Sequence, residues 1–178
     1  NENQLNEGLG LGTIDIVYVG VNFAASTYKP LGISGAPYML RDLDHWKAYR
    51  DSKLFADLVK GYDDKTRHKI VALTYYGQRH VTANKPIKRP EDMKGMRLRV
   101  PAAPLFLMFT KSVGANATPI AFSDVYQALK QGLVDGQDNP LPTIMAKKFY
   151  EVQSHIGLAG HIKESMVAVI GSHLWYKL

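Results

Sequence analysis

The stretch DMKGMRLRVP at Asp92–Pro101 reads as a polar turn followed by a short strand. Apolar residues at positions 96, 98 and 100 alternate with Arg97 and Arg99, which is the period of a strand with two different faces. Both arginines are therefore expected on the same side of a sheet. Pro101 ends the strand and Pro104 can begin a helix, because proline lacks the N–H that a strand interior requires and suits the first helical turn.

Upstream of this stretch, short runs rich in β-branched and aromatic residues predict strands, and glycines separate them. These runs are Thr13–Gly20, Leu31–Pro37, Lys69–Tyr76 and Arg79–Ala83. A helix is expected over Glu2–Leu11, followed by a turn. Asp42 or Asp44 can cap a further helical region, in which apolar residues at intervals of four continue to Tyr62.

Downstream, Ser123 is expected to cap the clearest helix of the chain, which has an apolar stripe at positions 125, 128, 129 and 133. Asp135 and Gly136 end this helix. Two more strands are predicted at Ile156–Leu158 and Ser165–Ile170. Strands that alternate with helices predict an α/β fold in which helices cover both faces of the sheet.

The composition is that of an ordinary globular chain of 178 residues, 46% hydrophobic and 21% charged. Its apolar runs are far shorter than the roughly 20 residues that span a bilayer, so the chain is not expected to span a membrane. The net charge of +6 is concentrated between Lys85 and Arg99, which favours anionic partners. Nucleic acid is not expected, because this run lacks aromatic residues for base stacking and is interrupted by Glu91 and Asp92.

The motifs of metal and covalent catalysis are not found in the sequence. There is no cysteine, which excludes thiolate zinc sites and cysteine nucleophiles, and the six histidines are far apart along the chain. The glycines at 8, 10 and 12 precede a strand, whereas those of a dinucleotide-binding loop follow one. No catalytic residue, metal site or cofactor is therefore predicted. An α/β enzyme acting on a small carboxylate is the alternative function.

Arg99 is the side chain with the clearest possible binding role. A guanidinium group binds a carboxylate through two parallel hydrogen bonds, in a geometry that lysine does not reproduce. The other interpretation is an ion pair with a neighbouring Asp or Glu of the chain. The spacing alone favours this ion pair.

The region from Asp92 to Gln153 resembles the signature region of the substrate-binding proteins of tripartite ATP-independent periplasmic (TRAP) transporters, the DctP-like family. The motifs are DMKGMRLRVP at Asp92–Pro101, GANATPIAFSDVYQALKQGLVDGQDNPLPT at Gly114–Thr143 and KFYEVQ at Lys148–Gln153. A weaker resemblance at Tyr75–Ile87 and Leu11–Gly20 extends it over essentially the whole chain.

The resemblance implies a type II-like periplasmic binding protein architecture, in which two α/β domains flank a ligand cleft. Residues 1–76 with 166–178 would form part of the first domain, and residues 77–165 the second. Family members are longer, so the chain is expected to be truncated at both ends, with a signal peptide that is not present in this sequence. The family implies a periplasmic receptor without catalytic activity. It closes over a small organic carboxylate and delivers it to the membrane subunits of a TRAP transporter, and we expect a monomer.

Site residues are carried over from the same resemblance. Arg99 matches the arginine that forms a bidentate salt bridge with the ligand carboxylate, and Asn139 matches an asparagine that hydrogen-bonds to the ligand. Phe122 matches an aromatic wall of the pocket, and Arg79 a second, more variable basic contact. The expected ligand is a C4-dicarboxylate, a sugar acid or a related hydroxy or oxo acid. Sialate-binding members carry an acidic residue and an arginine where this chain has Gly20–Phe23, which argues against sialic acid.

Overall fold

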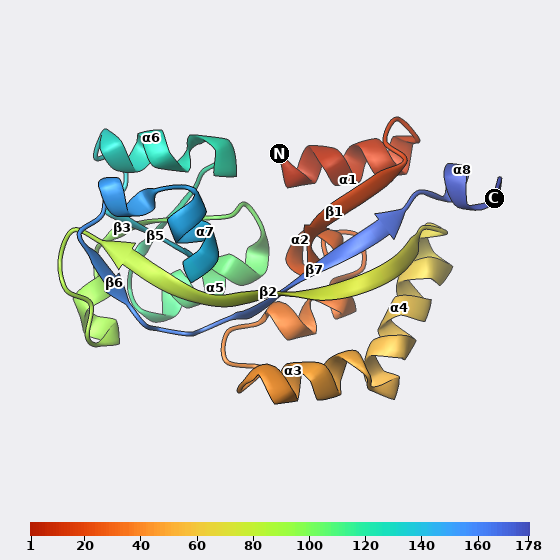
Figure 1. The fold of residues 1–178 in the computed structure, drawn as a ribbon, viewed down its shortest axis with the longest axis horizontal. Helices are drawn as coiled ribbons and strands as arrows, with labels where there is room; N and C mark the ends of the chain where they lie inside the picture. Colours follow the sequence, from red (N-terminus) through yellow and green to blue (C-terminus); the bar gives the residue numbers. More distant parts are fainter. The chain divides into compact units, whose positions relative to one another are not determined.

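A computed structural model describes all residues 1–178 and divides the chain into two compact units (Figure 1). Unit 1 contains Asn1–Tyr76 and Lys163–Leu178, and unit 2 contains Gly77–Ile162. The chain passes from unit 1 to unit 2 within one long strand, and it returns between residues 162 and 163. The family resemblance predicts this return after residue 165. Each unit combines helices with a sheet, so the predicted α/β class is correct.

Unit 1 is built on three strands in the order β1, β7, β2, with β1 antiparallel to β7. Its strands are β1 (Ile16–Gly20), β7 (Lys163–Ile170) and the first half of β2 (Lys69–Ala83). Its helices are α1 (Glu2–Leu11), α2 (Val21–Ala24), the 3-10 helix η1 (Lys29–Gly35), α3 (Leu43–Arg50), α4 (Lys53–Thr66) and α8 (Ser172–Trp175). None of the helices in the structure is both long enough and apolar enough to span a membrane.

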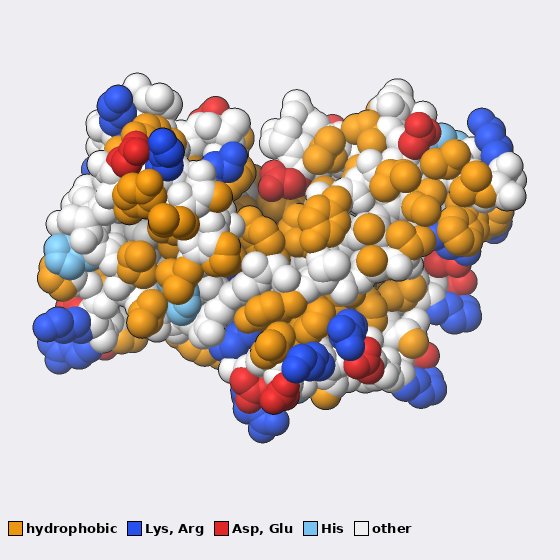
Figure 2. All heavy atoms as spheres, in the orientation of Figure 1, with side chains coloured by type: hydrophobic (Ala, Val, Ile, Leu, Met, Phe, Trp, Pro, Cys, Tyr) orange, Lys and Arg blue, Asp and Glu red, His pale blue; other side chains and the backbone are white.

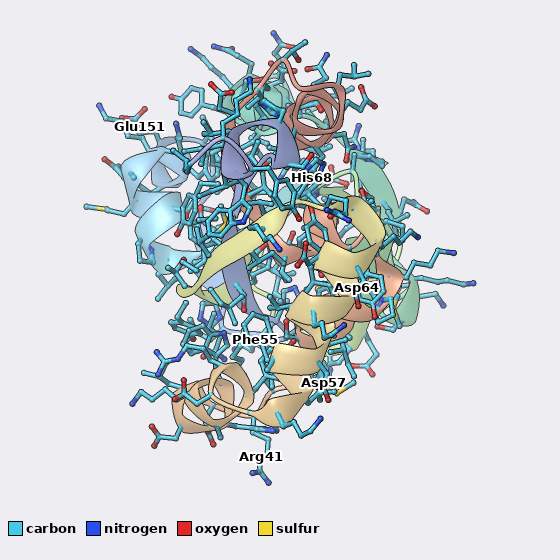
Figure 3. All side chains as sticks on the ribbon, turned by 90° about the vertical axis from the view of Figure 1, so that its right-hand side faces the viewer. Arg41, Phe55, Asp57, Asp64, His68 and Glu151 are labelled. Carbon is cyan, nitrogen blue, oxygen red and sulfur yellow. The ribbon has the colours of Figure 1, made fainter.

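The helix ends of unit 1 follow the capping residues of the sequence. The Asp42 side chain accepts a hydrogen bond from the backbone of residue 45 at the start of α3. Asp42 is one of the two residues predicted to cap this helix, so that prediction is confirmed. Ser52 accepts from the backbone N–H of Phe55 at the start of α4. Figure 3 looks along this part of the molecule, with Phe55 directed inward from α4 and Asp57 and Asp64 on its exposed side.

The two faces of the unit 1 sheet differ in their cover. Val17 and Val19 on β1 are buried, together with Val167 and Val169 on β7, and α2 and η1 contact β7. Ile16 and Tyr18 point to the other face and remain about half exposed. Figure 2 shows hydrophobic side chains gathered over the part of unit 1 where Figure 1 draws β1 and β7.

Unit 2 has a central sheet in the order β2, β5, β3, β4, and β6 pairs with the other edge of β2. β3 is parallel to β4 and β5, while β2 is antiparallel to β5 and β6. Besides the second half of β2, the strands are β3 (Arg97–Val100), β4 (Asn116–Pro119), β5 (Gly136–Pro140) and β6 (His155–Gly157). The helices are η2 (Pro90–Met93), α5 (Pro104–Ser112), η3 (Phe122–Asp124), α6 (Val125–Lys130), α7 (Leu141–Ala146) and η4 (Phe149–Glu151).

Two apolar clusters stabilise unit 2. The first joins the strands β2 and β3 to α5 and contains Val81, Ala83, Met93, Met96, Leu98 and Phe109. The second lies around α6 and α7 and contains Val125, Ala128, Leu129, Val134, Ile144 and Phe149. The first cluster thus packs α5 against the strands β2 and β3, and the second packs α6 against α7.

Several local predictions are wrong, and each has a physical reason. The run Leu31–Pro37 was expected as a strand but falls largely in the 3-10 helix η1, because a short apolar run bounded by glycine does not distinguish the two. Lys69–Tyr76 and Arg79–Ala83 form one continuous strand, and Gly77 between them adopts a φ of 131°, which a residue with a side chain rarely reaches. Ser123 does not cap a helix. It lies inside η3, its hydroxyl bonds to the next side chain, and α6 begins only at residue 125.

Candidate functional site

Strand register places the predicted site residues on two different faces of the unit 2 sheet. Gln137 lies opposite Arg99 on β3 and opposite Thr82 on β2, so these three side chains share one face. Asn139 shares this face because it follows Gln137 by two residues. Asp138 lies between them and points to the other face, as does Arg79, whose partner in β5 is residue 140.

Arg99 is fixed in position by the backbone at the end of β4. Its Nε and Nη2 atoms both donate to the carbonyl oxygen of Ile120, at 2.9 and 2.7 Å. Only 2% of its surface is exposed. Two hydrogen bonds to one acceptor hold the plane of the guanidinium, which carries five donors in a rigid fork. The structure therefore gives Arg99 one defined orientation.

Phe122 lies beside this guanidinium. The Cζ atom of Arg99 lies 5.9 Å from the centre of the Phe122 ring, and the Lys147 ammonium lies 5.4 Å from the same ring. The ring meets Phe149 edge-on at 6.4 Å, which anchors it to the α6–α7 cluster. One aromatic ring thus contacts two cations, an arrangement favoured by the negative face of the ring.

Asn139 is part of a chain of buried amide and hydroxyl groups. Its Nδ2 donates to Gln137 Oε1 at 2.6 Å, and Gln137 Nε2 donates to Thr82 Oγ1 at 3.0 Å. The Thr82 hydroxyl then donates to Gln153 Oε1 at 2.9 Å. Asn139 lies in the central strand β5, and only 3% of it is exposed.

Arg79 forms a buried ion pair on the opposite face. Its Nε donates to Asp138 Oδ2 at 2.6 Å, and its Nη2 donates to the backbone oxygen of the same residue. Its Cζ atom lies 4.8 Å from the centre of the Phe106 ring on α5. The structure therefore places Arg99 and Asn139 on one face of the sheet, with Phe122 beside Arg99, and holds Arg79 on the other face.

His161 completes this ion pair and was not singled out by the sequence. Its Nε2 lies 3.0 Å from Asp138 Oδ2, and its ring stacks on Phe109 with centroids 3.7 Å apart. Burial opposes ionisation of Asp138, but the charges and hydrogen bonds of Arg79 and His161 outweigh it and hold the pKa of Asp138 well below its ordinary value. No sequence motif marks His161, since its partners lie 23 and 52 residues upstream.

The chemistry of the site is that of binding. Fixed guanidinium donors, a neutral amide and an aromatic ring are groups that recognise an oxygen-rich anion by charge, hydrogen bonds and stacking. No group of three His, Cys, Asp or Glu side chains in the chain is arranged to hold a metal ion.

Fold and site together define an α/β binding protein, and comparison with known proteins identifies its family. The chain matches the family described as bacterial extracellular solute-binding protein, family 7 (DctP), over residues 1–178. The chain therefore belongs to the DctP family, as its motifs predict. This is a family of solute-binding receptors of TRAP transporters rather than of enzymes.

Three similar proteins illustrate the family. The sialic acid-binding periplasmic protein SiaP of Vibrio cholerae is 36% identical over 182 residues, which cover 100% of this chain and 56% of that protein. The 2,3-diketo-L-gulonate-binding periplasmic protein YiaO of Escherichia coli is 31% identical over 171 residues, 96% of this chain and 52% of that protein. A TRAP periplasmic solute-binding protein from Polaromonas, solved bound to D-erythronate, superimposes with a TM-score of 0.93 at 32% identity, over 99% of this chain and 58% of that one. The chain thus spans about half the length of the relatives that it matches.

Proposed function

We propose that this chain belongs to a periplasmic receptor that captures a small organic carboxylate, with Arg99 as the residue that binds the carboxylate group. The receptor delivers its ligand to the membrane subunits of a TRAP transporter. The proposal rests on the geometry of Arg99. Because its guanidinium is buried and held in one plane, it loses little conformational freedom when an anion binds.

The neighbours of Arg99 suit the rest of such a ligand. Phe122 offers an apolar surface beside the cation, and Asn139 offers an amide at the end of β5. The roles of these two residues and the second basic contact predicted for Arg79 stay predictions. For Arg79, the proposed contact would have to coexist with its ion pair to Asp138.

A sugar acid is the ligand class that the comparisons support best. The ligands named for the three relatives are sialic acid, 2,3-diketo-L-gulonate and D-erythronate, and each is a carboxylic acid bearing hydroxyl or keto groups. A polar layer of Asn139, Gln137 and Thr82 on the same sheet face as Arg99 provides partners for such groups. The expectation against sialic acid, drawn from Gly20–Phe23, stays a prediction.

The test is ligand binding by the intact protein, screened with sugar acids and C4-dicarboxylates by thermal shift and measured by calorimetry. A ligand present at 100 times its dissociation constant should stabilise the protein by about 2.7 kcal/mol. Arg99→Lys keeps the charge but loses the planar fork, so affinity should fall at least tenfold. Arg97→Lys is the matched control, because Arg97 lies two residues away on β3 but is exposed and paired with Asp135. Equal affinity of wild type and Arg99→Lys would show that Arg99 does not bind the ligand carboxylate as proposed.

A further inference from the structure

The excess positive charge of the chain belongs almost entirely to unit 2. This unit carries 11 Lys and Arg residues against 6 Asp and Glu, a net charge of +5, whereas unit 1 has 11 against 10, a net charge of +1. Two of the arginines, Arg79 and Arg99, are buried. The remaining excess lies on the surface of unit 2 and is available to a partner.

Part of this charge lines a surface hollow at the edge of the sheet where β3 and β5 begin. The hollow measures about 440 Å³ and is lined by Asn84, Lys85, Lys94, Gly95, Met96, Arg97, Leu129, Gly132, Val134 and Asp135. It shares no lining residue with the proposed carboxylate site. Open space lies above Gly95 and Gly132, where an added Cβ would meet no atom within 4 Å.

The acidic residues beside the hollow are already engaged within unit 2. Asp135 pairs with Arg97, Nη2 to Oδ1 at 2.6 Å, and also accepts from the Arg97 backbone at 2.7 Å. Asp92 accepts from the backbone N–H groups of Lys88 and Arg89. Lys85 and Lys94 are exposed and form no salt bridge. The hollow therefore presents two ammonium groups that can meet external carboxylates.

We propose that this hollow is a docking site for an acidic segment of a partner protein, with carboxylates on Lys85 and Lys94 and backbone lying over Gly95 and Gly132. A polypeptide fits better than a small anion. Each exposed ion pair contributes roughly 0–1 kcal/mol, so one small anion gains little, whereas a segment with several carboxylates combines such contacts. The concave shape also favours a protruding chain over a flat membrane surface. We expect this segment on the membrane subunits of the transporter, so this part of the inference rests on the proposed function.

The test uses the intact protein and a fluorescein-labelled 14-residue peptide that repeats glutamate and leucine at helical spacing, with anisotropy as the readout. The Lys85→Glu/Lys94→Glu variant should weaken binding at least tenfold, and the milder Lys85→Gln/Lys94→Gln variant by an intermediate factor. The control Lys29→Glu/Lys53→Glu changes the net charge equally, but on exposed lysines of unit 1, and should stay within twofold of wild type. Circular dichroism confirms that each variant is folded.

Three outcomes would overturn the proposal. Equal weakening by the unit 1 control would show attraction by net charge alone, and equal binding of a peptide with glutamine in place of glutamate would show apolar association only. Vesicles of phosphatidylglycerol that bind with the same dependence on Lys85 and Lys94, where the peptide does not, would assign the surface to lipid. The proposed function is tested separately, because the Lys85 and Lys94 variants should bind sugar acids as wild type does.

Discussion

Asp138→Asn should be among the most destabilising conservative substitutions in unit 2. The Asp138 carboxylate is 6% exposed, its partner Arg79 is 2% exposed, and His161 shares the same oxygen. Replacing the carboxylate with an amide leaves the Arg79 cation buried beside Phe106 without its countercharge. Breaking a buried pair in this way costs about 3–5 kcal/mol. For a chain of this size, that loss lowers the melting temperature by roughly 6–20 °C.

The measurement is urea denaturation, with circular dichroism reporting on the whole chain. Both tryptophans, Trp46 and Trp175, lie in unit 1, so fluorescence follows that unit and should change less than the dichroism. Asp57→Asn is the matched control, because Asp57 forms an exposed i,i+4 pair on α4 (Figure 3). It should cost about 0.3–0.5 kcal/mol. A loss below about 1 kcal/mol for Asp138→Asn would show that the Arg79–Asp138 pair is not a strongly interacting pair shielded from water.

The loss of stability caused by Asp138→Asn should depend on pH in a definite direction. The pKa of Asp138 lies below its ordinary value of 3.8 in the folded chain, so the unfolded chain binds the proton first as pH falls. The stability that ionised Asp138 contributes is therefore complete above pH 3.8 and is lost as pH drops below that value toward the folded-state pKa. The difference in unfolding free energy between wild type and Asp138→Asn should therefore shrink as pH falls below 3.8. A difference that grows with acid would contradict the assignment.

Three further substitutions test a close backbone contact, the conformational freedom of a helical glycine and a buried hydrogen bond. Gly136→Ala should cost at least about 1–3 kcal/mol in urea denaturation, because its Cβ would lie 2.2 Å from the backbone oxygen of Thr82. Gly10→Ala, in helix α1 with open space around it, should instead stabilise the chain by roughly 0.5–1 kcal/mol. Trp46→Phe removes the buried hydrogen bond from Nε1 to Ser165 Oγ at 2.8 Å and should cost about 1–3 kcal/mol, and equal stability of this variant would contradict that bond.

Local sequence signals predicted the elements with regular patterns. The alternation around Arg97 and Arg99, the proline at 104 and the β-branched run of β1 each produced an element close to its expected bounds. The strand β5 was not predicted, because GQDNP has the composition of a turn and low strand propensity. Its pairing with β2 and β3 overrides that propensity, and pairing between distant segments cannot be read from local sequence.

The candidate site could be predicted only in part, because contacts between distant segments cannot be read from local sequence. The family motif identified Arg99, Asn139 and Phe122, and the structure places all three in unit 2, with Arg99 beside Phe122. The motif did not reveal that Arg79 pairs with Asp138, or that His161 joins them, since these contacts depend on which face of the sheet each residue occupies. Binding roles for the four predicted residues stay predictions until ligands are measured.

The alternation of side chains along β5 has a practical consequence for redesign. Positions 137 and 139 face the proposed ligand side, while position 138 anchors the opposite layer. A library that randomises 137 and 139 but keeps Asp138 would sample new selectivities on a scaffold whose electrostatic anchor is untouched. Substitutions at alternate codons can therefore alter the proposed ligand side and leave the Arg79–Asp138 ion pair in place.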